Sequence, residues 1–187
     1  RKNKTPIQMF QCLKISFKGR GGLKALANTE SNDLPRRLLG NNLVLAMYAN
    51  ELLSRLLPEA EAHPRVFFSY QKFVEGISQA TDSEQQLTLR LFENQLLEEL
   101  GYGLDFRCDY SGQPISSTMN YHFAEQEGFF RHADGKIPGE ILLKFAADTT
   151  QNFSTKELKI AKGLNRQRLR ALLGDKPLKS RELFVVN

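Results

Sequence analysis

The hydrophobic residues of this 187-residue chain change their spacing once, near residue 40. Between Ile7 and Lys18 they recur mostly at every second position, which predicts a β-strand with one buried face. From Asn41 onward they recur every three or four positions, which predicts amphipathic helices. This pattern predicts an α+β fold that begins with a sheet and continues with helices.

The first segment predicts a β-hairpin. One face of its leading strand carries the apolar residues Ile7, Met9, Leu13, Ile15 and Phe17. The segment Gly19-Arg20-Gly21-Gly22 permits a chain reversal, and we expect Leu23–Thr29 to form the returning strand. Two strands alone are marginally stable in water, so we expect this hairpin to belong to a larger sheet whose other strands precede Arg1.

Three amphipathic helices are predicted next. They cover residues 41–57, residues 64–77, and a third segment that starts at Asp82 or Ser83 and stops before Gly101. In the third helix, Gln85 or Gln86 completes a capping box. The predicted buried stripe of the first helix consists of Leu43, Met47, Leu52 or Leu53, and Leu57. Three consecutive helices of this kind predict a bundle-like core.

The rest of the chain predicts a small β subdomain followed by two more helices. Glycines and Pro114 interrupt the helical spacing between residues 102 and 136. Helices are predicted at Pro138–Ala147 and at Ser154–Leu173, the latter with a Ser154–Glu157 capping box. We therefore expect a domain of residues 1–31 and a mainly helical domain of residues 32–187, with an irregular β insertion at about 102–136.

Charge is unevenly distributed along the chain. Residues 1–37 contain nine Lys and Arg against two acids, residues 38–150 eight against sixteen, and residues 151–187 nine against three. Two basic ends around an acidic middle indicate a polyanion partner such as nucleic acid. The alternative is that the basic ends only make the surface more soluble.

Sequence signatures of enzymes are absent. There is no phosphate-binding loop, dinucleotide fingerprint, nucleophile elbow or His-Glu-x-x-His motif. Three possible zinc ligands, Cys108, His122 and His132, are widely spaced, and Ser111 stands where a paired cysteine would be. Structural zinc needs four ligands, so we expect no metal and no cofactor.

The sequence also bears on location. The longest apolar run, Leu43–Ala49, is far shorter than the roughly 20 residues that cross a bilayer. No leader-like segment opens the chain, and two cysteines cannot make a disulfide framework. We therefore expect a cytoplasmic protein, of which this chain is a fragment because it starts with Arg1.

Two groups of cations are candidate nucleic-acid contacts. The first lies at the start of the chain and consists of Arg1, Lys2, Lys4, Lys14, Lys18, Arg20 and Lys24. A hairpin with cations on one face suits a phosphate backbone, and few aromatic residues are available to read bases. The second group lies on the last predicted helix, where its side chains project within about 80° of one another, and consists of Lys159, Lys162, Arg166 and Arg170. This stripe is either a binding surface or an ordinary solvated helix face.

Arg90 lies between Leu89 and Leu91 in the third predicted helix. An arginine beside exposed apolar surface can hold a carboxylate while an apolar neighbour packs next to it. Arg90 can equally pair with Glu93, three residues further along the same helix face. Spacing alone favours this second, structural interpretation.

Five strings resemble the bacterial recombination mediator family RecO. They occur in the family's order and span nearly the whole chain: Gly19-Arg20-Gly21-Gly22-Leu23-Lys24, Tyr48-Ala49-Asn50-Glu51-Leu52-Leu53, Leu89-Arg90-Leu91-Phe92-Glu93, Leu100-Gly101-Tyr102-Gly103-Leu104-Asp105 and Lys176-Pro177-Leu178-Lys179-Ser180-Arg181-Glu182-Leu183-Phe184. The resemblance implies a partial N-terminal OB-fold β-barrel followed by a mainly helical domain. Some members carry zinc on cysteine pairs, whereas this chain has only Cys108 in such a position, which implies a metal-free member.

The resemblance also implies a non-enzymatic function in DNA repair. The family binds single- and double-stranded DNA, anneals complementary strands, and works with RecR to load RecA. It binds the acidic tail of single-stranded DNA-binding protein, and Arg90 matches the arginine of that tail site. Lys14, Lys18, Arg20 and Lys24 fall on the family's basic OB surface. The implied location is the bacterial cytoplasm, at the nucleoid.

Two other functions are open to test. This chain could be a protein-interaction adaptor that touches DNA only weakly. A metal-dependent nuclease is disfavoured because the sequence lacks a clustered carboxylate site.

Overall fold

The computed structural model describes residues 6–31, 33–147 and 153–184. It divides into two compact units, Arg1–Gly40 and Asn41–Asn187. The division falls after Gly40 instead of after residue 31, because the segment that follows the hairpin is bonded to it. The Cys12 amide donates to Asp33 Oδ1 at 3.0 Å, and Arg36 Nη1 donates to the Phe10 carbonyl at 3.1 Å.

The first unit contains one antiparallel hairpin, β1 (Leu13–Lys18) and β2 (Ala25–Ser31). The register runs from Leu13 opposite Ser31 to Lys18 opposite Ala25, with a shift between Ser16 and Phe17. The hairpin prediction is confirmed, but β1 begins at Leu13 instead of Ile7, and β2 lies two residues later than expected. Met9 and Phe10 lie in a turn and not in the predicted strand. The described residues of this unit close no barrel, so the partial OB-fold stays a prediction.

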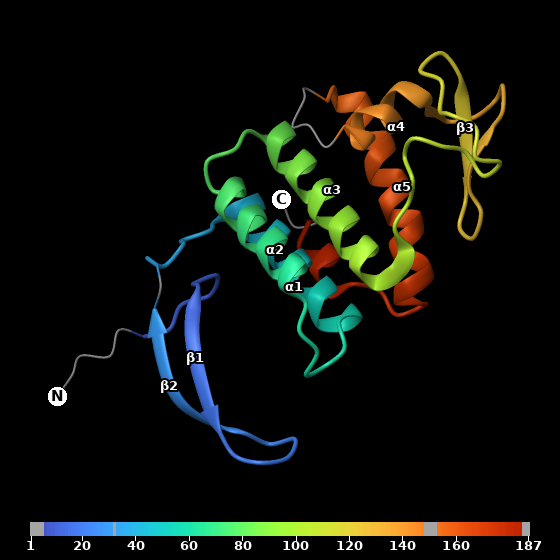
Figure 1. Ribbon diagram of the computed structural model, residues 1–187. Helices are drawn as coiled ribbons and strands as arrows, with labels where there is room; N and C mark the ends of the chain where they lie inside the picture. The colour runs from blue at the N-terminus through green and yellow to red at the C-terminus, as the bar shows by residue number, and fades with distance from the viewer. Residues whose placement is uncertain (1–5, 32, 148–152, 185–187) are drawn as a thin grey trace. The chain divides into compact units, whose positions relative to one another are not determined.

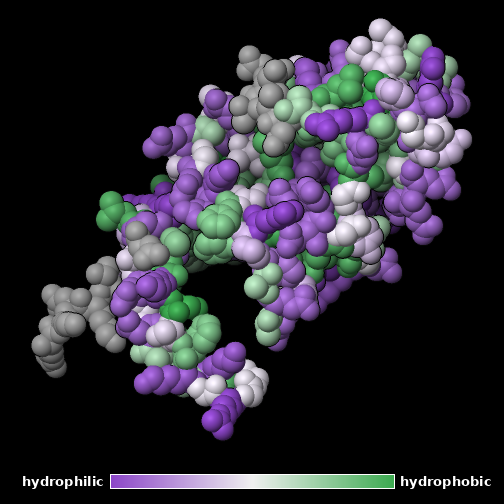
Figure 2. Space-filling view, in the orientation of Figure 1, coloured by the Kyte–Doolittle hydropathy of each residue, from purple (hydrophilic) through white to green (hydrophobic). Residues whose placement is uncertain are grey.

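The predicted buried face of the hairpin is wrong for the described chain. Ile15 is 49% exposed and Phe17 54% exposed, and on β2 Leu26 is 61% exposed. Figure 2 accordingly shows hydrophobic side chains among the hydrophilic ones on the hairpin surface. Alternation located residues 13–18 of the strand correctly. Burial of one face also needs a covering layer, which the described residues of the first unit do not provide.

The second unit is built on the three predicted helices, α1 (Gly40–Leu56), α2 (Pro64–Ile77) and α3 (Asp82–Leu97). A π-helical turn, η1 (Glu98–Tyr102), continues α3, and Gly101 leaves it with a φ of 83°. Figure 1 shows α3 between α2 and α5, and α3 packs against both. No helix in the described parts of the chain is long and apolar enough to cross a membrane.

Two details of these helices differ from prediction. The buried residues of α1 are Leu45, Ala46, Tyr48, Ala49 and Leu52, because the run from Leu43 to Ala49 is apolar on all sides and does not define one face. The capping box of α3 joins Thr81 to Glu84, one residue earlier than expected. Thr81 supplies a hydroxyl acceptor, which leaves Asp82 as the first helical residue.

The predicted irregular insertion contains a small sheet of β3 (Asn120–Ala124), β4 (Gly128–Arg131) and β5 (Ile137–Pro138), in the order β4-β3-β5. Its backbone approaches closely at Gly139, where a Cβ would lie 2.0 Å from the Ser116 carbonyl oxygen. Tyr121 and Phe129 are each 1% exposed and share a core cluster with Leu142 and Leu164. This packing fixes the sheet against the helical core.

Two helices and a short 3-10 segment complete the second unit. They are α4 (Gly139–Ala146), α5 (Thr155–Leu173) and η2 (Lys179–Phe184). The Ser154–Glu157 capping box at the start of α5 is confirmed, as is the end of α5 at Gly174, which has a φ of 63°. The buried inner face of α5, formed by Leu158, Ala161, Leu164 and Leu169, leaves the predicted cationic stripe on the opposite face.

Candidate functional site

A cavity of about 330 Å³ lies beside Arg90 in the second unit. It is lined by four cations, by the polar Gln86 and by a largely apolar wall: Arg90, Lys162, Arg166, Arg181, Gln86, Leu45, Tyr48 and Leu89. These side chains come from α1, α3, α5 and η2, which are far apart in the sequence. A small hollow with cations beside leucines suits a ligand that carries both carboxylates and an apolar group.

Arg90 is held at this cavity by a buried carboxylate. Its side chain is 5% exposed, and its Nη1 lies 2.9 Å from Glu93 Oε2. The Glu93 side chain is fully buried and accepts from the Tyr48 hydroxyl at 2.8 Å and from Asn165 Nδ2 at 3.0 Å. Burial and the Glu93 charge raise the pKa of Tyr48, so this hydroxyl stays protonated and donates.

The same polar network continues to the end of α3. Arg168 is buried, and its guanidinium donates to Asn94 Oδ1 and to the Tyr102 carbonyl, both at 2.8 Å. Arg168 also donates to Asn165 Oδ1 at 3.3 Å. Burial lowers the pKa of Arg168 to about 10, and Glu93 opposes the shift. These bonds tie α5 to α3 behind the cavity.

Arg181 reaches the cavity because α1 anchors η2. Glu51 accepts from the amides of Lys179 and Ser180 at 2.9 and 2.8 Å, and from the Ser180 hydroxyl at 2.6 Å. Arg55 donates to main-chain carbonyls just before η2, including that of Lys176 at 2.9 Å. Two of the strings that carry the family resemblance therefore contact each other, and this contact places a fourth cation beside Arg90.

The predicted stripe on α5 is divided between two hollows. Lys162 and Arg166 line the Arg90 cavity, whereas Arg166 and Arg170 line a second hollow together with Glu125 and Asp175. Lys159 lines neither. Burial and the charges of Arg90, Arg166 and Arg181 lower the pKa of Lys162, while Glu93 opposes the shift. Cations crowded in this way, with one buried carboxylate among them, favour an anionic ligand.

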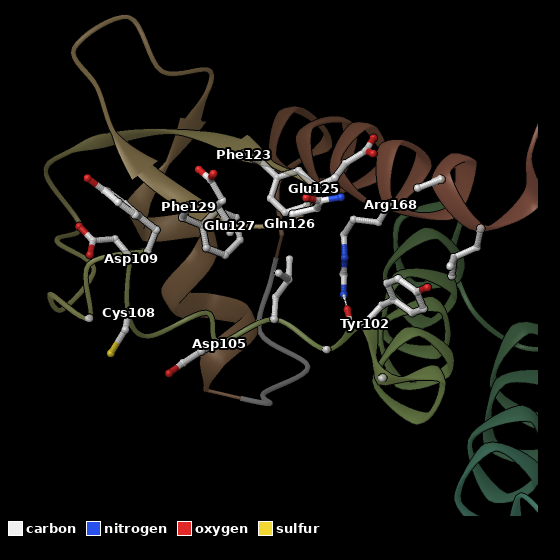
Figure 3. Close-up of a pocket in the computed structure, with 18 residues that line it drawn as sticks. Tyr102, Asp105, Cys108, Asp109, Phe123, Glu125, Gln126, Glu127, Phe129 and Arg168 are labelled. Carbon is white, nitrogen blue, oxygen red and sulfur yellow. Dashed lines mark hydrogen bonds between the residues drawn. The ribbon is translucent and has the colours of Figure 1, made fainter.

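A larger cavity, about 830 Å³, has the opposite character (Figure 3). Its rim carries Asp105 and Asp109 from the loop after η1 and Glu125 and Glu127 from the turn between β3 and β4. The one guanidinium that lines it, that of Arg168, is already bonded to the Tyr102 carbonyl, as the dashed line shows. Four carboxylates repel a polyanion, so this cavity is not the candidate site.

Cys108 also lines this acidic cavity. Burial and the nearby Asp105 raise the pKa of its thiol, which disfavours the reactive thiolate. The rings of His122 and His132 contact each other at a tilt of 42°, with ring centroids 4.8 Å apart. Among the described residues, no three His, Cys, Asp or Glu side chains form a group that could hold a metal ion.

The hairpin cations do not gather on one face. Lys14 and Lys18 are exposed and project from the same face of β1, since side chains alternate along a strand. Lys24 lies with its ammonium 5.6 Å from the ring of Phe17, which belongs to the other face. Arg20 is exposed in the turn between the strands. The other candidates, Arg1, Lys2 and Lys4, lie outside the described residues.

Sequence reasoning found Arg90 but missed two of its neighbours, Tyr48 and Arg181. It also missed Glu51, which anchors η2. Arg181 was part of a family string without a role, and Tyr48 and Glu51 were residues of another. A fully buried glutamate is rarely stable without partners, so Glu93 signals a polar network once its burial is known. No spacing rule could have joined residues 48, 93, 165 and 181, because their contacts depend on helix packing.

Comparison with known proteins gives a consistent family. A family model described as "Recombination protein O C terminal" matches residues 38–182. The DNA repair protein RecO of Proteus mirabilis is 39% identical over 183 residues, which cover 97% of this chain and 74% of that protein. The RecO proteins of Pseudoalteromonas translucida and Psychromonas ingrahamii are 37% and 42% identical, covering 100% and 95% of this chain and 80% and 77% of those proteins. The cationic cavity and the contact between Glu51 and η2 both lie within the matched residues 38–182. The family model and these identities show that the chain belongs to the RecO family of DNA repair proteins.

Proposed function

We propose that this chain is a recombination mediator that works by binding, without catalysing a covalent step. In this proposal it binds single- and double-stranded DNA, anneals complementary strands at the bacterial nucleoid, and helps RecR load RecA. Membership of a family of DNA repair proteins supports the repair function. The proposed partner of the helical unit is the acidic C-terminal tail of single-stranded DNA-binding protein.

The cationic cavity at Arg90 carries the proposal for the tail. Lys162, Arg166 and Arg181 have no carboxylate partner among the described residues and are free to meet the carboxylates of a peptide. Leu45 and Leu89 offer an apolar wall for a hydrophobic side chain at the peptide's end. The combination recognises an acidic segment that ends in an apolar residue, because a purely charged ligand would leave the two leucines exposed to water.

DNA contact is proposed for the exposed hairpin. Lys14 and Lys18 on one face of β1, with Arg20 in the turn, can neutralise phosphates without reading bases. Cations that screen two backbones lower the repulsion that opposes strand pairing. Each neutralised phosphate on duplex DNA contributes about 0.9 to the slope of log affinity against log salt concentration.

A peptide titration with matched variants tests the tail site. We expect Lys162→Ala combined with Arg166→Ala to lower the affinity for an acidic tail peptide at least roughly tenfold, since a charge-assisted hydrogen bond contributes about 1.5 kcal/mol or more. Lys159→Ala is the matched control, because Lys159 is on the same helix but does not line the cavity. These variants are preferable to Arg90→Ala, which would leave Glu93 buried and unpaired at a cost of about 3–5 kcal/mol. Equal affinities of all three proteins would contradict the tail site.

An interaction adaptor with only weak DNA binding is the second candidate. The cation-lined cavity lies wholly in the second unit, and the hairpin cations are divided between two faces. Titration of a labelled oligonucleotide at two salt concentrations separates the two functions. Salt-sensitive binding supports the mediator, and peptide binding without it supports the adaptor. Cleaved oligonucleotide after addition of magnesium would contradict both.

A further inference from the structure

Glu93 occupies an unusual position behind the cationic cavity. Its side chain is fully buried, yet it does not line the cavity. Both carboxylate oxygens are used: Oε1 accepts from Tyr48 of α1, and Oε2 contacts Asn165 of α5 and Arg90 of its own helix. A buried carboxylate with donors from three helices cannot change rotamer without breaking several bonds.

Arg90 is the only one of these donors with a charge, and it faces two environments. One Nη1 contact, at 2.9 Å, binds it to Glu93, while its side chain lines the cavity. Its Nε is buried and has no hydrogen-bond partner among the described residues. An arginine has five N–H donors in a fixed fork. Fixing one arm on Glu93 therefore fixes the direction of the donors that remain.

The backbone behind this pair is fixed as well. Asn165 Nδ2 donates to the Arg90 carbonyl at 3.2 Å as well as to Glu93. Asn165 is itself 2% exposed and accepts from Arg168. Asn165 of α5 thus holds the main chain of Arg90 directly and its guanidinium through Glu93. The same helix also supplies Lys162 and Arg166 to the cavity.

We propose that Glu93 is a positioning residue that orients the Arg90 guanidinium toward a carboxylate of the acidic peptide, an inference that rests on the proposed tail site. In this proposal the guanidinium of Arg90 binds Glu93 through one arm and the peptide through its remaining donors. A pre-oriented guanidinium loses less side-chain freedom on binding, which favours the bound state. Glu93 itself does not touch the peptide.

Substitution of Glu93 distinguishes positioning from simple charge by the sign of the effect. Glu93→Gln keeps the size of the side chain but removes a negative charge that lies close to a site for an anion. If Glu93 acts only through its charge, the variant binds the acidic peptide more tightly. Positioning predicts binding about tenfold weaker, the equivalent of one charge-assisted hydrogen bond.

The experiment measures peptide affinity for four proteins: the unsubstituted chain, Glu93→Gln, Arg90→Lys, and both changes together. Arg90→Lys keeps a cation beside Glu93 but removes the fork. We expect each single change to lower the affinity for the peptide. The second change should add little to the first, because both act through the same guanidinium. Glu140→Gln, an exposed glutamate on α4, is the control for loss of one negative charge.

A second readout separates failure of this inference from failure of the tail site. The ¹H–¹⁵N signal of Arg90 Nε reports guanidinium order without any peptide. We expect a sharp, slowly exchanging signal that broadens in Glu93→Gln and not in Glu140→Gln. An unchanged signal together with equal or tighter peptide binding overturns the positioning function. If the signal broadens but Lys162→Ala with Arg166→Ala leaves peptide affinity intact, Glu93 orients Arg90 and the tail site is wrong.

Discussion

Arg90 shows how two interpretations of one residue can both describe it. Its spacing to Glu93 predicted an ion pair, and the pair forms with 2.9 Å between the charged atoms. Its family match implied a ligand contact, and the same side chain lines a cavity with three further cations. The ligand contact stays a proposal, but the pair leaves donors of the guanidinium available for it.

Lys162 gives the cavity a dependence on pH. Burial and the neighbouring cations Arg90, Arg166 and Arg181 lower its pKa, and Glu93 opposes the shift. A lowered lysine pKa means that the ammonium loses its proton at a lower pH than an exposed lysine does. We expect affinity for an acidic peptide to fall by up to roughly tenfold, the loss of one charge-assisted hydrogen bond, as the pH rises from neutral toward the ordinary lysine pKa of about 10.4.

Peptide titrations across this range measure the effect. Lys162→Arg should bind with an affinity that changes much less, because arginine keeps its charge above pH 10. Lys159→Arg is the matched control and should keep the pH dependence of the unsubstituted chain, since Lys159 lies outside the cavity. A flat profile for the unsubstituted chain would exclude Lys162 from the contact.

At the scale of the elements, the start of α3 is a helix end that the local sequence did not define to the residue. The sequence predicted a start at Asp82 or Ser83, whereas the structure places the cap at Thr81. The Thr81 amide donates to Glu84 Oε2 at 2.7 Å, and the Glu84 amide donates to Thr81 Oγ1 at 3.5 Å. These reciprocal bonds satisfy donors that the helix itself cannot.

This assignment predicts a difference between two neighbouring substitutions. Thr81→Ala removes the cap and should lower the free energy of unfolding by about 1 kcal/mol, which corresponds to a fall in Tm of roughly 2–4 °C for a chain of this size. Ser83→Ala should leave Tm within about 1 °C, because Ser83 is an exposed helical residue without a capping bond. Thermal unfolding followed by circular dichroism measures both. A larger fall in Tm for Ser83→Ala than for Thr81→Ala would contradict this assignment and support Ser83 as the cap.

The sequence predicted best the helices whose start and end are both marked by local residues. The helix at residues 64–77 has Pro64 at its start and an apolar stripe to Ile77, and both ends are confirmed. The helix α5 has a capping box and a terminal glycine, and it too was located correctly. In α1 the apolar run gave the element but not its buried face, because only packing against Glu93 and α3 draws Tyr48 inward.

The candidate site could be predicted only in part, for the same reason. Arg90, Lys162 and Arg166 were candidates from spacing and resemblance, but nothing joined the two groups. Their meeting depends on the pairing of α3 with α5 through Asn165 and on the attachment of η2 to Glu51. Such contacts connect residues more than 70 positions apart, and they are decided by shape and burial instead of local pattern.

For the whole molecule, the charge pattern of the sequence finds a partial explanation. The basic end at residues 151–187 contributes three cations to the Arg90 cavity, Lys162, Arg166 and Arg181. Much of the acidic middle lies elsewhere, and four of its carboxylates line the cavity of Figure 3. The two parts proposed to bind anions, the Arg90 cavity and the exposed hairpin, belong to different units of the chain. Peptide and DNA can therefore be tested as independent ligands.

The most direct test of the account is to map an acidic tail peptide onto the protein by NMR. Titration of ¹⁵N-labelled chain should shift the amides of residues 89–90, 162–166 and 180–182, together with the Arg90 Nε signal. Amides of the hairpin at residues 13–31 should stay in place, while an oligonucleotide should shift the hairpin and not the cavity. Peptide shifts confined to the hairpin or the acidic cavity, or none at all, would contradict the central claim that the cationic cavity at Arg90 is the site of the acidic tail.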